Sequence, residues 1–207
     1  MNKAYLYLEM ILLFIGIPLF LFLDIIPYLR IPLLLLFTIF IFIYLFRNKT
    51  FQNKEFLRIK GKAGYLKQIL PRIIIISVMI VLLALLLVPH EFLFIVKELP
   101  LIWLLIIFLY PLLSAYPQEI IYRAFFYDRY GILFPDEKIA VIVNAFLFSF
   151  LHIIYKNPVA ILLTFFAGLL FAVTYRKSNS VLVVAIEHSI YGILIFTFGL
   201  GMFFYNM

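Results

Sequence analysis

Glu119 and Arg123 place a carboxylate and a guanidinium four residues apart between long apolar stretches. On a helix, side chains at this spacing lie on one face about one turn apart and can pair. Two histidines, His152 and His188, stand inside later apolar segments. Ionisable residues within membrane segments are costly and are therefore candidates for a functional site. The Glu119–Arg123 pair indicates either a catalytic carboxylate held by its arginine or a structural ion pair that locks a helix to its neighbours.

His152 belongs to a stripe of side chains that includes Asn144 and Phe148, at successive intervals of four residues. Such a stripe lies along one face of a helix. In an apolar span, a face with an amide, an aromatic ring and an imidazole is expected to point inward rather than to lipid. The alternative for His152 is a histidine that hydrogen-bonds a backbone carbonyl near the end of its span.

Glu187 and His188 are adjacent, so on a helix they point about 100° apart and do not share a face. His188 is expected either to face the interior of the bundle or to form an interhelical hydrogen bond. Glu187 is expected to pair with a basic residue, and Arg123, Arg176 and Lys177 are the candidates.

If Glu119, His152 and His188 meet in one cavity, three kinds of chemistry are open. A carboxylate and two imidazoles can activate a water and stabilise an oxyanion. They can ligate a divalent metal such as zinc, or relay protons in a transporter. The order of the segments places His152 near the outer end of its span and Glu119 near the inner end of its own. The spacing therefore leaves open whether all three residues meet.

The elements that must position these residues are transmembrane helices. Hydrophobic residues make up 67% of the 207 residues and charged residues 13%, with a mean hydropathy of +1.16. A soluble domain carries about 25% charged residues. The chain has no cysteine, which excludes disulfides, thiolate catalysis and metal sites built from cysteine.

We expect an all-α transmembrane bundle of about seven spans, with six to eight possible. A span needs about 20 mostly apolar residues. Pro117 is expected to break or kink the fourth span and to open a helix over 118–129. The predicted spans are 4–22, 31–46, 69–88, 99–116, 138–155, 159–175 and 181–205.

The stretch 47–72 holds eight of the 17 Lys and Arg residues and a single acid, Glu55. The positive-inside rule places such a loop in the cytoplasm. If the seven spans then alternate, only Arg30, Lys97 and Lys156 lie on the outer side. The N-terminus is therefore predicted inside and the C-terminus outside. The net charge of +7 fits basic loops near anionic lipid, so no nucleic-acid partner is expected.

Three short motifs, in order along the chain, resemble those of the CPBP family of intramembrane proteases, also called the Abi or type II CAAX endopeptidase family. The family pattern is E-E-x-x-x-R on one helix, F-x-x-x-H on a later helix and H-x-x-x-N on a third. This chain has QEIIYR at 118–123, FSFLH at 148–152 and HSIYG at 188–192. The resemblance covers roughly residues 99–204.

The resemblance implies a helical bundle with a polar cavity open toward the cytoplasmic side, and hydrolysis of a peptide bond inside the membrane. In the family, the first Glu and the His of F-x-x-x-H activate the water, and the later His and Asn stabilise the oxyanion. The implied catalytic residues are Glu119, His152 and His188, with Gln118, Arg123, Asn144, Phe148 and Gly192 in support.

Two positions depart from the family pattern. Gln118 stands where the family has its water-activating Glu, and a neutral amide cannot act as a general base. Gly192 stands where the oxyanion Asn belongs, and loss of one such donor can cost about 10²–10³ in rate. Glu119 then becomes the candidate base, after a slight rotation of its helix.

We therefore expect one integral membrane domain, with N-terminal spans at 1–98 and a protease-like core at 99–207. The expected activity is a glutamic-type or metallo-type peptidase in a bacterial plasma membrane. The expected partners are membrane lipid and a peptide or lipidated-peptide substrate, and the oligomeric state is left open. Two alternatives remain: an inactive relative that binds membrane peptides without cutting them, and a small proton-coupled transporter.

Overall fold

The structure is a computed structural model that describes residues 2–23, 30–47 and 63–205. The regular structure in these ranges is helical, as the all-α prediction requires. Residues 24–29, in the connection between the first two predicted spans, lie outside the described residues. So does the part of the predicted basic loop between residues 48 and 62.

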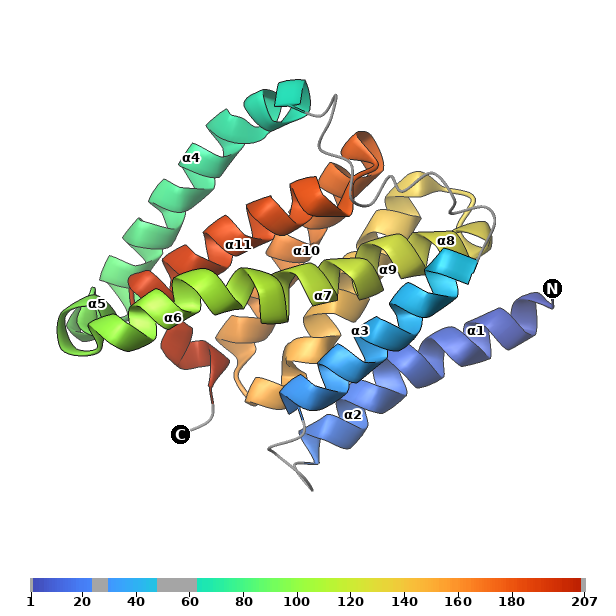
Figure 1. Cartoon of the computed structure of the whole chain (residues 1–207), viewed down its shortest axis with the longest axis horizontal. Coiled ribbons are helices and arrows are strands. Elements are labelled where there is room, and N and C mark those ends of the chain that lie inside the picture. Colours follow the sequence, from blue (N-terminus) through green and yellow to red (C-terminus); the bar gives the residue numbers. More distant parts are fainter. Residues whose placement is uncertain (1, 24–29, 48–62, 206–207) are drawn as a thin grey trace.

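Seven apolar helices in the described ranges correspond to the seven predicted spans. Five are long and apolar enough to cross a membrane: Lys3–Phe22, Gly64–Leu87, Pro100–Leu133, Glu137–Tyr155 and Pro158–Ser178. Two are shorter, Pro32–Leu45 and Val181–Thr197. In Figure 1 the labelled helices are α1 (Lys3–Ile11), α2 (Ile17–Phe22), α3 (Arg30–Arg47), α4 (Ala63–Leu87), α5 (Phe94–Glu98), α6 (Pro100–Tyr110), α7 (Tyr116–Glu119), α8 (Phe126–Tyr130), α9 (Glu137–Leu151), α10 (Pro158–Ser178) and α11 (Val181–Thr197).

Helix α11 lies at the centre of the arrangement and contacts α4, α6, α7 and α10. In Figure 1, α4 covers one side of α11, and α1, α2 and α3 lie on the opposite side of the molecule. The helix that contains α6, α7 and α8 crosses between these two groups. Every helix that carries a candidate site residue therefore packs in the middle of the bundle.

A break or a kink was predicted at Pro117, and the break is wrong, because the chain stays helical from Pro100 to Leu133. Proline has no N–H, and its ring collides with the carbonyl of the preceding turn of an α-helix. A wider π-helical turn over Pro111–Ala115 directly precedes α7 and makes room for the ring. A second such turn, Ile120–Phe125, follows α7. Such π-helical bulges frequently occur at functional sites.

Side-chain caps begin α9 and α10. Asp136 accepts a hydrogen bond from the backbone N–H of Lys138 at 2.7 Å and begins α9. Asn157 accepts one from Val159 at 2.8 Å and begins α10. Each cap satisfies an amide that the helix leaves unpaired at its N-terminus. The short connection 152–157 joins α9 to α10, and the two helices pack against each other.

Glu187 on α11 pairs with Arg72 on α4, which corrects the predicted partners Arg123, Arg176 and Lys177. The Arg72 guanidinium lies 2.7 Å from the Glu187 carboxylate, which is fully buried. The hydroxyl groups of Thr174 and Tyr191 donate to the same carboxylate at 2.7 and 3.0 Å. The sequence did not predict this contact, because Arg72 lies 115 residues before Glu187 and on a different helix, α4.

Arg72→Met is expected to destabilise the protein by about 2 kcal/mol, because it leaves the Glu187 carboxylate without a cation. The estimate is below the range for fully buried pairs because the Arg72 side chain is 27% exposed. Thermal unfolding in detergent would show a lower midpoint. Arg176→Met is the matched control, because Arg176 pairs with Glu137 at the surface and exposed pairs contribute little. Equal midpoints for the two variants would contradict the prediction.

Candidate active site

Gln118 and Glu119 are neighbours on α7 that point to different sides of the helix. The Gln118 side chain faces a cavity, whereas the Glu119 carboxylate is fully buried against α11. This follows from helix geometry, since adjacent side chains diverge by about 100°. The residue at the family's first Glu position therefore faces the cavity in this chain, and it is an amide.

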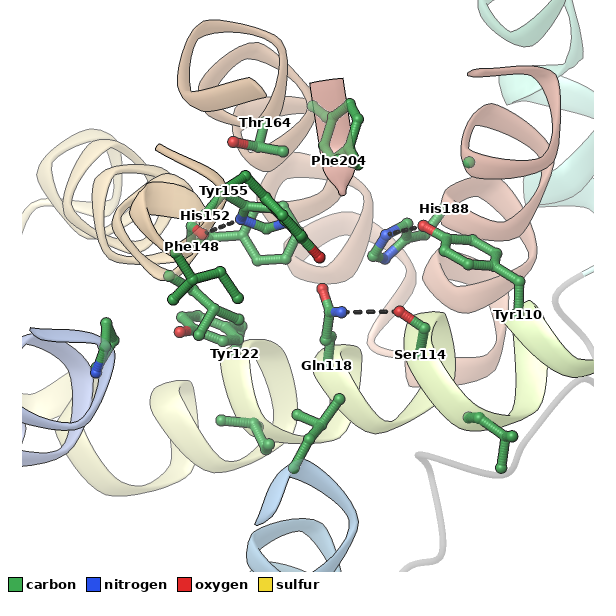
Figure 2. A pocket seen from close by; sticks show the side chains of 18 of the residues that line it. Tyr110, Ser114, Gln118, Tyr122, Phe148, His152, Tyr155, Thr164, His188 and Phe204 are labelled. Carbon is green, nitrogen blue, oxygen red and sulfur yellow. Dashed lines mark hydrogen bonds between the residues drawn. The ribbon is translucent and has the colours of Figure 1, made fainter. Parts of the chain in front are cut away.

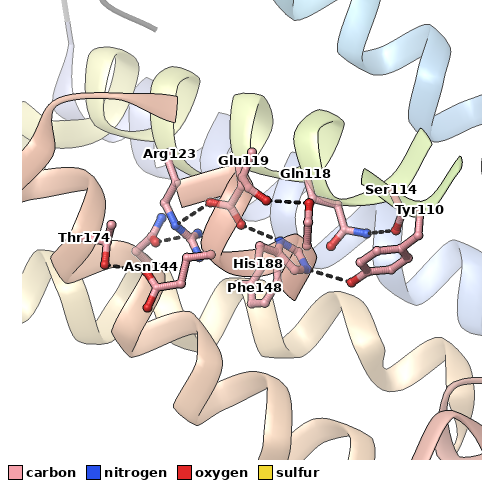
Figure 3. Close-up of polar contacts among 12 residues, drawn as sticks. Tyr110, Ser114, Gln118, Glu119, Arg123, Asn144, Phe148, Thr174 and His188 are labelled. Atoms are coloured by element: carbon pink, nitrogen blue, oxygen red, sulfur yellow. Dashed lines mark hydrogen bonds and ion pairs between the residues drawn. The ribbon is translucent and has the colours of Figure 1, made fainter. Parts of the chain in front are cut away.

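Arg123 holds Glu119 in place as the spacing of four residues predicted. Its Nε lies 3.1 Å from Glu119 Oε2, and both side chains are fully buried. Its Nη1 donates to Asn144 Oδ1 at 2.8 Å, and Asn144 Nδ2 donates to the Tyr122 carbonyl at 2.6 Å. The guanidinium also lies over the Phe148 ring, 4.9 Å from its centre. Asn144 and Phe148 thus fix the position of the arginine, and the arginine fixes the carboxylate (Figure 3).

His188 joins Glu119 to the cavity. Its Nδ1 lies 2.8 Å from Glu119 Oε1, and its Nε2 lies 3.0 Å from the Tyr110 hydroxyl. Phe171 stacks on the ring with its centre 4.6 Å away. A carboxylate can only accept a hydrogen bond, so Nδ1 carries a proton and donates it to Glu119. This arrangement fixes both the orientation and the tautomer of the imidazole.

His152 lies where α9 ends and a 3₁₀ turn begins. Its Nδ1 donates to the Phe148 carbonyl at 2.8 Å, which is the backbone hydrogen bond considered in the alternative interpretation. The same bond leaves a lone pair on Nε2 in the neutral ring. The ring also lines the cavity. The backbone contact and a role at the cavity are therefore compatible in one residue.

A cavity of 1160 Å³ brings these side chains together. Its walls are mostly apolar, and the lining residues include side chains from α2, α3, α6, α7, α9, α10 and α11. Gln118, His152 and His188 all line it, whereas Glu119, Arg123 and Asn144 do not. Figure 2 shows Gln118 pointing into the space between Tyr155 and His188. Gln118, His152 and His188 thus form the polar region of an otherwise mostly apolar cavity, called the chamber below.

The sequence placed Glu119 and His152 toward opposite ends of their spans, but the structure does not separate them in this way. Glu119 lies near the middle of the continuous helix Pro100–Leu133, rather than at the inner end of a shorter span. The Phe148 ring contacts both imidazoles, with centres 5.0 Å from His152 and 5.7 Å from His188. Glu119 and His188 meet directly, and His152 joins them across Phe148.

Two polar residues on the cavity wall were not predicted from the sequence. Ser114 accepts a hydrogen bond from Gln118 Nε2 at 3.0 Å, and Tyr110 contacts His188. The Gln118 Oε1 atom is buried without a hydrogen-bond partner among the described residues. Tyr110, Ser114 and Gln118 recur at intervals of four. That spacing is the sequence signal that could have placed all three on one helix face.

The three predicted metal ligands do not fit a metal in this arrangement. Within the described ranges, no group of three or more His, Cys, Asp or Glu side chains could hold a metal ion. Both nitrogens of His188 already have partners, and the Glu119 carboxylate faces the Arg123 guanidinium. An arginine beside a carboxylate competes with a metal for it. The chemistry considered below therefore uses no metal.

Comparison with protein families gives one match. Residues 100–194 match the family described as type II CAAX prenyl endopeptidase Rce1-like. The matched residues include all three motifs, and the match supports the resemblance to the CPBP family that those motifs carry. At the level of the family, this indicates a CAAX-type intramembrane protease in an integral membrane protein. No curated protein and no solved structure matches the chain.

Proposed function

We propose that this protein is an intramembrane endopeptidase that hydrolyses a peptide bond in a membrane-associated peptide. The observation that carries the proposal is the position of Gln118, His152 and His188 on the wall of one largely apolar cavity. Polar groups are costly in such surroundings unless they have partners or a function. The family match supports the same class of reaction.

In the proposed reaction, His152 is the general base. Its Nε2 accepts a proton from a water. The second O–H of this water donates a hydrogen bond to Gln118 Oε1, which has no hydrogen-bond partner among the described residues. Two acceptors orient the water oxygen toward the substrate carbonyl. Gln118 cannot take a proton itself, so its role is to position the water. A positioned base of this kind contributes about 10²–10⁴ to the rate.

Glu119 and Arg123 are positioning residues in this proposal. Glu119 lies behind His188 and reaches the cavity only through the imidazole. It accepts the hydrogen bond of His188 Nδ1 and so holds the imidazole in one tautomer and orientation. Arg123 balances the buried carboxylate and prevents it from turning away. This assignment differs from direct base catalysis by Glu119, which would require the carboxylate to move to the cavity wall.

The substrate class follows from the chamber. Apolar side chains of α2, α3 and α6 form most of the wall away from the polar region. An apolar peptide segment or a lipid chain attached to a peptide would bury its surface there. We propose a peptide or lipidated peptide as substrate, in a bacterial plasma membrane, with the N-terminus in the cytoplasm.

Glu119→Gln is expected to lower peptide cleavage by about 10²-fold or more, because an amide can hold His188 in the wrong tautomer. The purified protein in liposomes would be incubated with a pool of membrane peptides and prenylated peptides. Products would be identified by mass spectrometry. Glu9→Gln is the matched control, since Glu9 pairs with Arg129 away from the cavity.

Equal cleavage by Glu119→Gln and wild type would contradict the role of Glu119.

A second candidate function is a binding protein that has lost the chemistry, and Gln118 favours it because the cavity wall presents an amide in place of a carboxylate. Folded wild-type protein that retains particular peptides and cuts none of them would establish that function instead.

A further inference from the structure

Tyr110 holds a position that the three motifs do not explain. It lies at the end of α6, and its hydroxyl is 3.0 Å from His188 Nε2 on the wall of the cavity. The rings of His188 and Phe196 contact it edge-on, with centres 5.9 and 5.7 Å away. These contacts point the hydroxyl at the polar region of the chamber (Figure 2).

Gly192 on α11 is the reason that Tyr110 fits. A Cβ atom at residue 192 would overlap Cε1, Cζ and the hydroxyl oxygen of Tyr110. Gly192 lies one helical turn after His188, on the same face of α11. The tyrosine therefore occupies the space next to His188 that a side chain at residue 192 would otherwise fill. Tyr110 and Gly192 form a matched pair.

The hydrogen bonds of Glu119, His188 and Tyr110 form one chain, which Figure 3 shows. His188 donates from Nδ1 to the Glu119 carboxylate. The neutral ring has a lone pair on Nε2, which accepts the hydrogen bond of the Tyr110 hydroxyl. A phenolic O–H can rotate about its C–O bond, and in its other orientation it donates into the cavity. The oxygen stays in place, because the Tyr110 ring packs between His188 and Phe196.

We propose that the Tyr110 hydroxyl donates a hydrogen bond to the substrate carbonyl oxygen and is the oxyanion donor that Gly192 cannot supply. The inference rests on the proposed peptidase function. The water oxygen bonds to the carbonyl carbon while one water proton passes to His152 Nε2. The carbonyl electron pair moves to the oxygen that Tyr110 contacts. When the oxyanion collapses, the C–N bond breaks and the leaving nitrogen takes the proton from His152.

The test compares wild type and Tyr110→Phe in liposomes. Steady-state cleavage is measured with the peptide of the membrane-peptide pool that wild type cleaves fastest. Phenylalanine keeps the ring in its place between His188 and Phe196 and removes only the donor. We expect kcat to fall by about 10²–10³-fold, because the donor acts on the charge that develops in the transition state. KM is expected to change little, which distinguishes this role from binding of the ground state.

A second variant separates the donor from a structural role. Tyr110→Ala with Gly192→Asn removes the ring and places a carboxamide donor beside His188. This double variant is expected to cleave about tenfold faster than Tyr110→Ala alone, since one donor replaces another. Equal thermal midpoints for wild type and Tyr110→Phe in detergent would show that the fold is kept.

The outcomes distinguish this inference from the function on which it rests. The role of Tyr110 is overturned if Tyr110→Phe cleaves like wild type, or if it raises KM with kcat unchanged. The peptidase function would stand in both cases. A folded double variant that recovers no activity over Tyr110→Ala also counts against it. If folded wild-type protein cuts no peptide, the peptidase function fails, and the role of Tyr110 fails with it.

Discussion

His152→Ala is expected to lower kcat for peptide hydrolysis by about 10³-fold, because it removes the group that takes the proton from water. The Nδ1 of His152 is engaged by the Phe148 carbonyl, so Nε2 is the nitrogen that can act as base. No other residue in the proposed reaction can replace it, since Gln118 does not accept a proton and Glu119 is buried behind His188. Single-turnover cleavage in liposomes measures the effect.

His152→Asn is the matched variant that separates chemistry from folding. The Asn Nδ2 occupies nearly the same place as the His Nδ1 and can still donate to the Phe148 carbonyl at the end of α9. We expect this variant to keep the stability of wild type and to lose activity like the alanine variant. His90→Ala is the control outside the cavity. Full activity in His152→Asn would show that another group accepts the proton.

Much of the fold could be predicted because the membrane imposes it. Long apolar segments must be helical so that their backbone groups are paired within the segment. Composition and segment length therefore predicted the helices of the described ranges, and the period of four predicted that Asn144 and Phe148 would face inward. The same argument predicted the Glu119–Arg123 pair, because both residues lie on one helix.

The sequence gives less information about contacts between helices. Glu187 was assigned to nearby basic residues, but Arg72 reaches it from α4. The continuous helix through Pro117 was missed, because the π-helical turns that absorb the proline have no simple sequence signature. Tyr110 was missed because it belongs to no motif, and the sequence identified its partner Gly192 only as a departure from the oxyanion Asn of the family pattern. These features depend on which helices lie side by side.

The structure assigns different positions to two adjacent polar residues. Gln118 reaches the cavity, and Glu119 reaches Arg123 and His188. A carboxylate at residue 119 is tolerated because two partners surround it. The Gln118 side chain has the Ser114 hydroxyl as its hydrogen-bond partner, and no ion pair to a cation is seen at this position among the described residues. The buried carboxylate of Glu119 is thus paired, whereas residue 118 presents a neutral amide at the cavity wall, where a charge would be costly to desolvate.

Gln118→Glu is expected to raise kcat by about 10²-fold, because it adds a second proton acceptor at the place where the water is held. Glutamate has the same length as glutamine, so a carboxylate oxygen takes the place of Oε1, which has no hydrogen-bond partner among the described residues, with little change in packing. Gln118→Met is the matched control, with similar length and no strong acceptor, and it is expected to cleave more slowly than wild type. A decrease in Gln118→Glu as well would show that the neutral amide suits the reaction better.

Adding Gly192→Asn to Gln118→Glu would complete the family motifs, but we expect it to cancel the gain. Any side chain at residue 192 overlaps the Tyr110 ring, so the tyrosine must leave its position beside His188. The new amide and the displaced hydroxyl then compete for one place, and α6 must move from α11. Activity is expected to fall below that of Gln118→Glu alone, and shortening Tyr110 to alanine in the same chain should restore it. Higher activity without that third change would show that Tyr110 and Gly192 are not a matched pair.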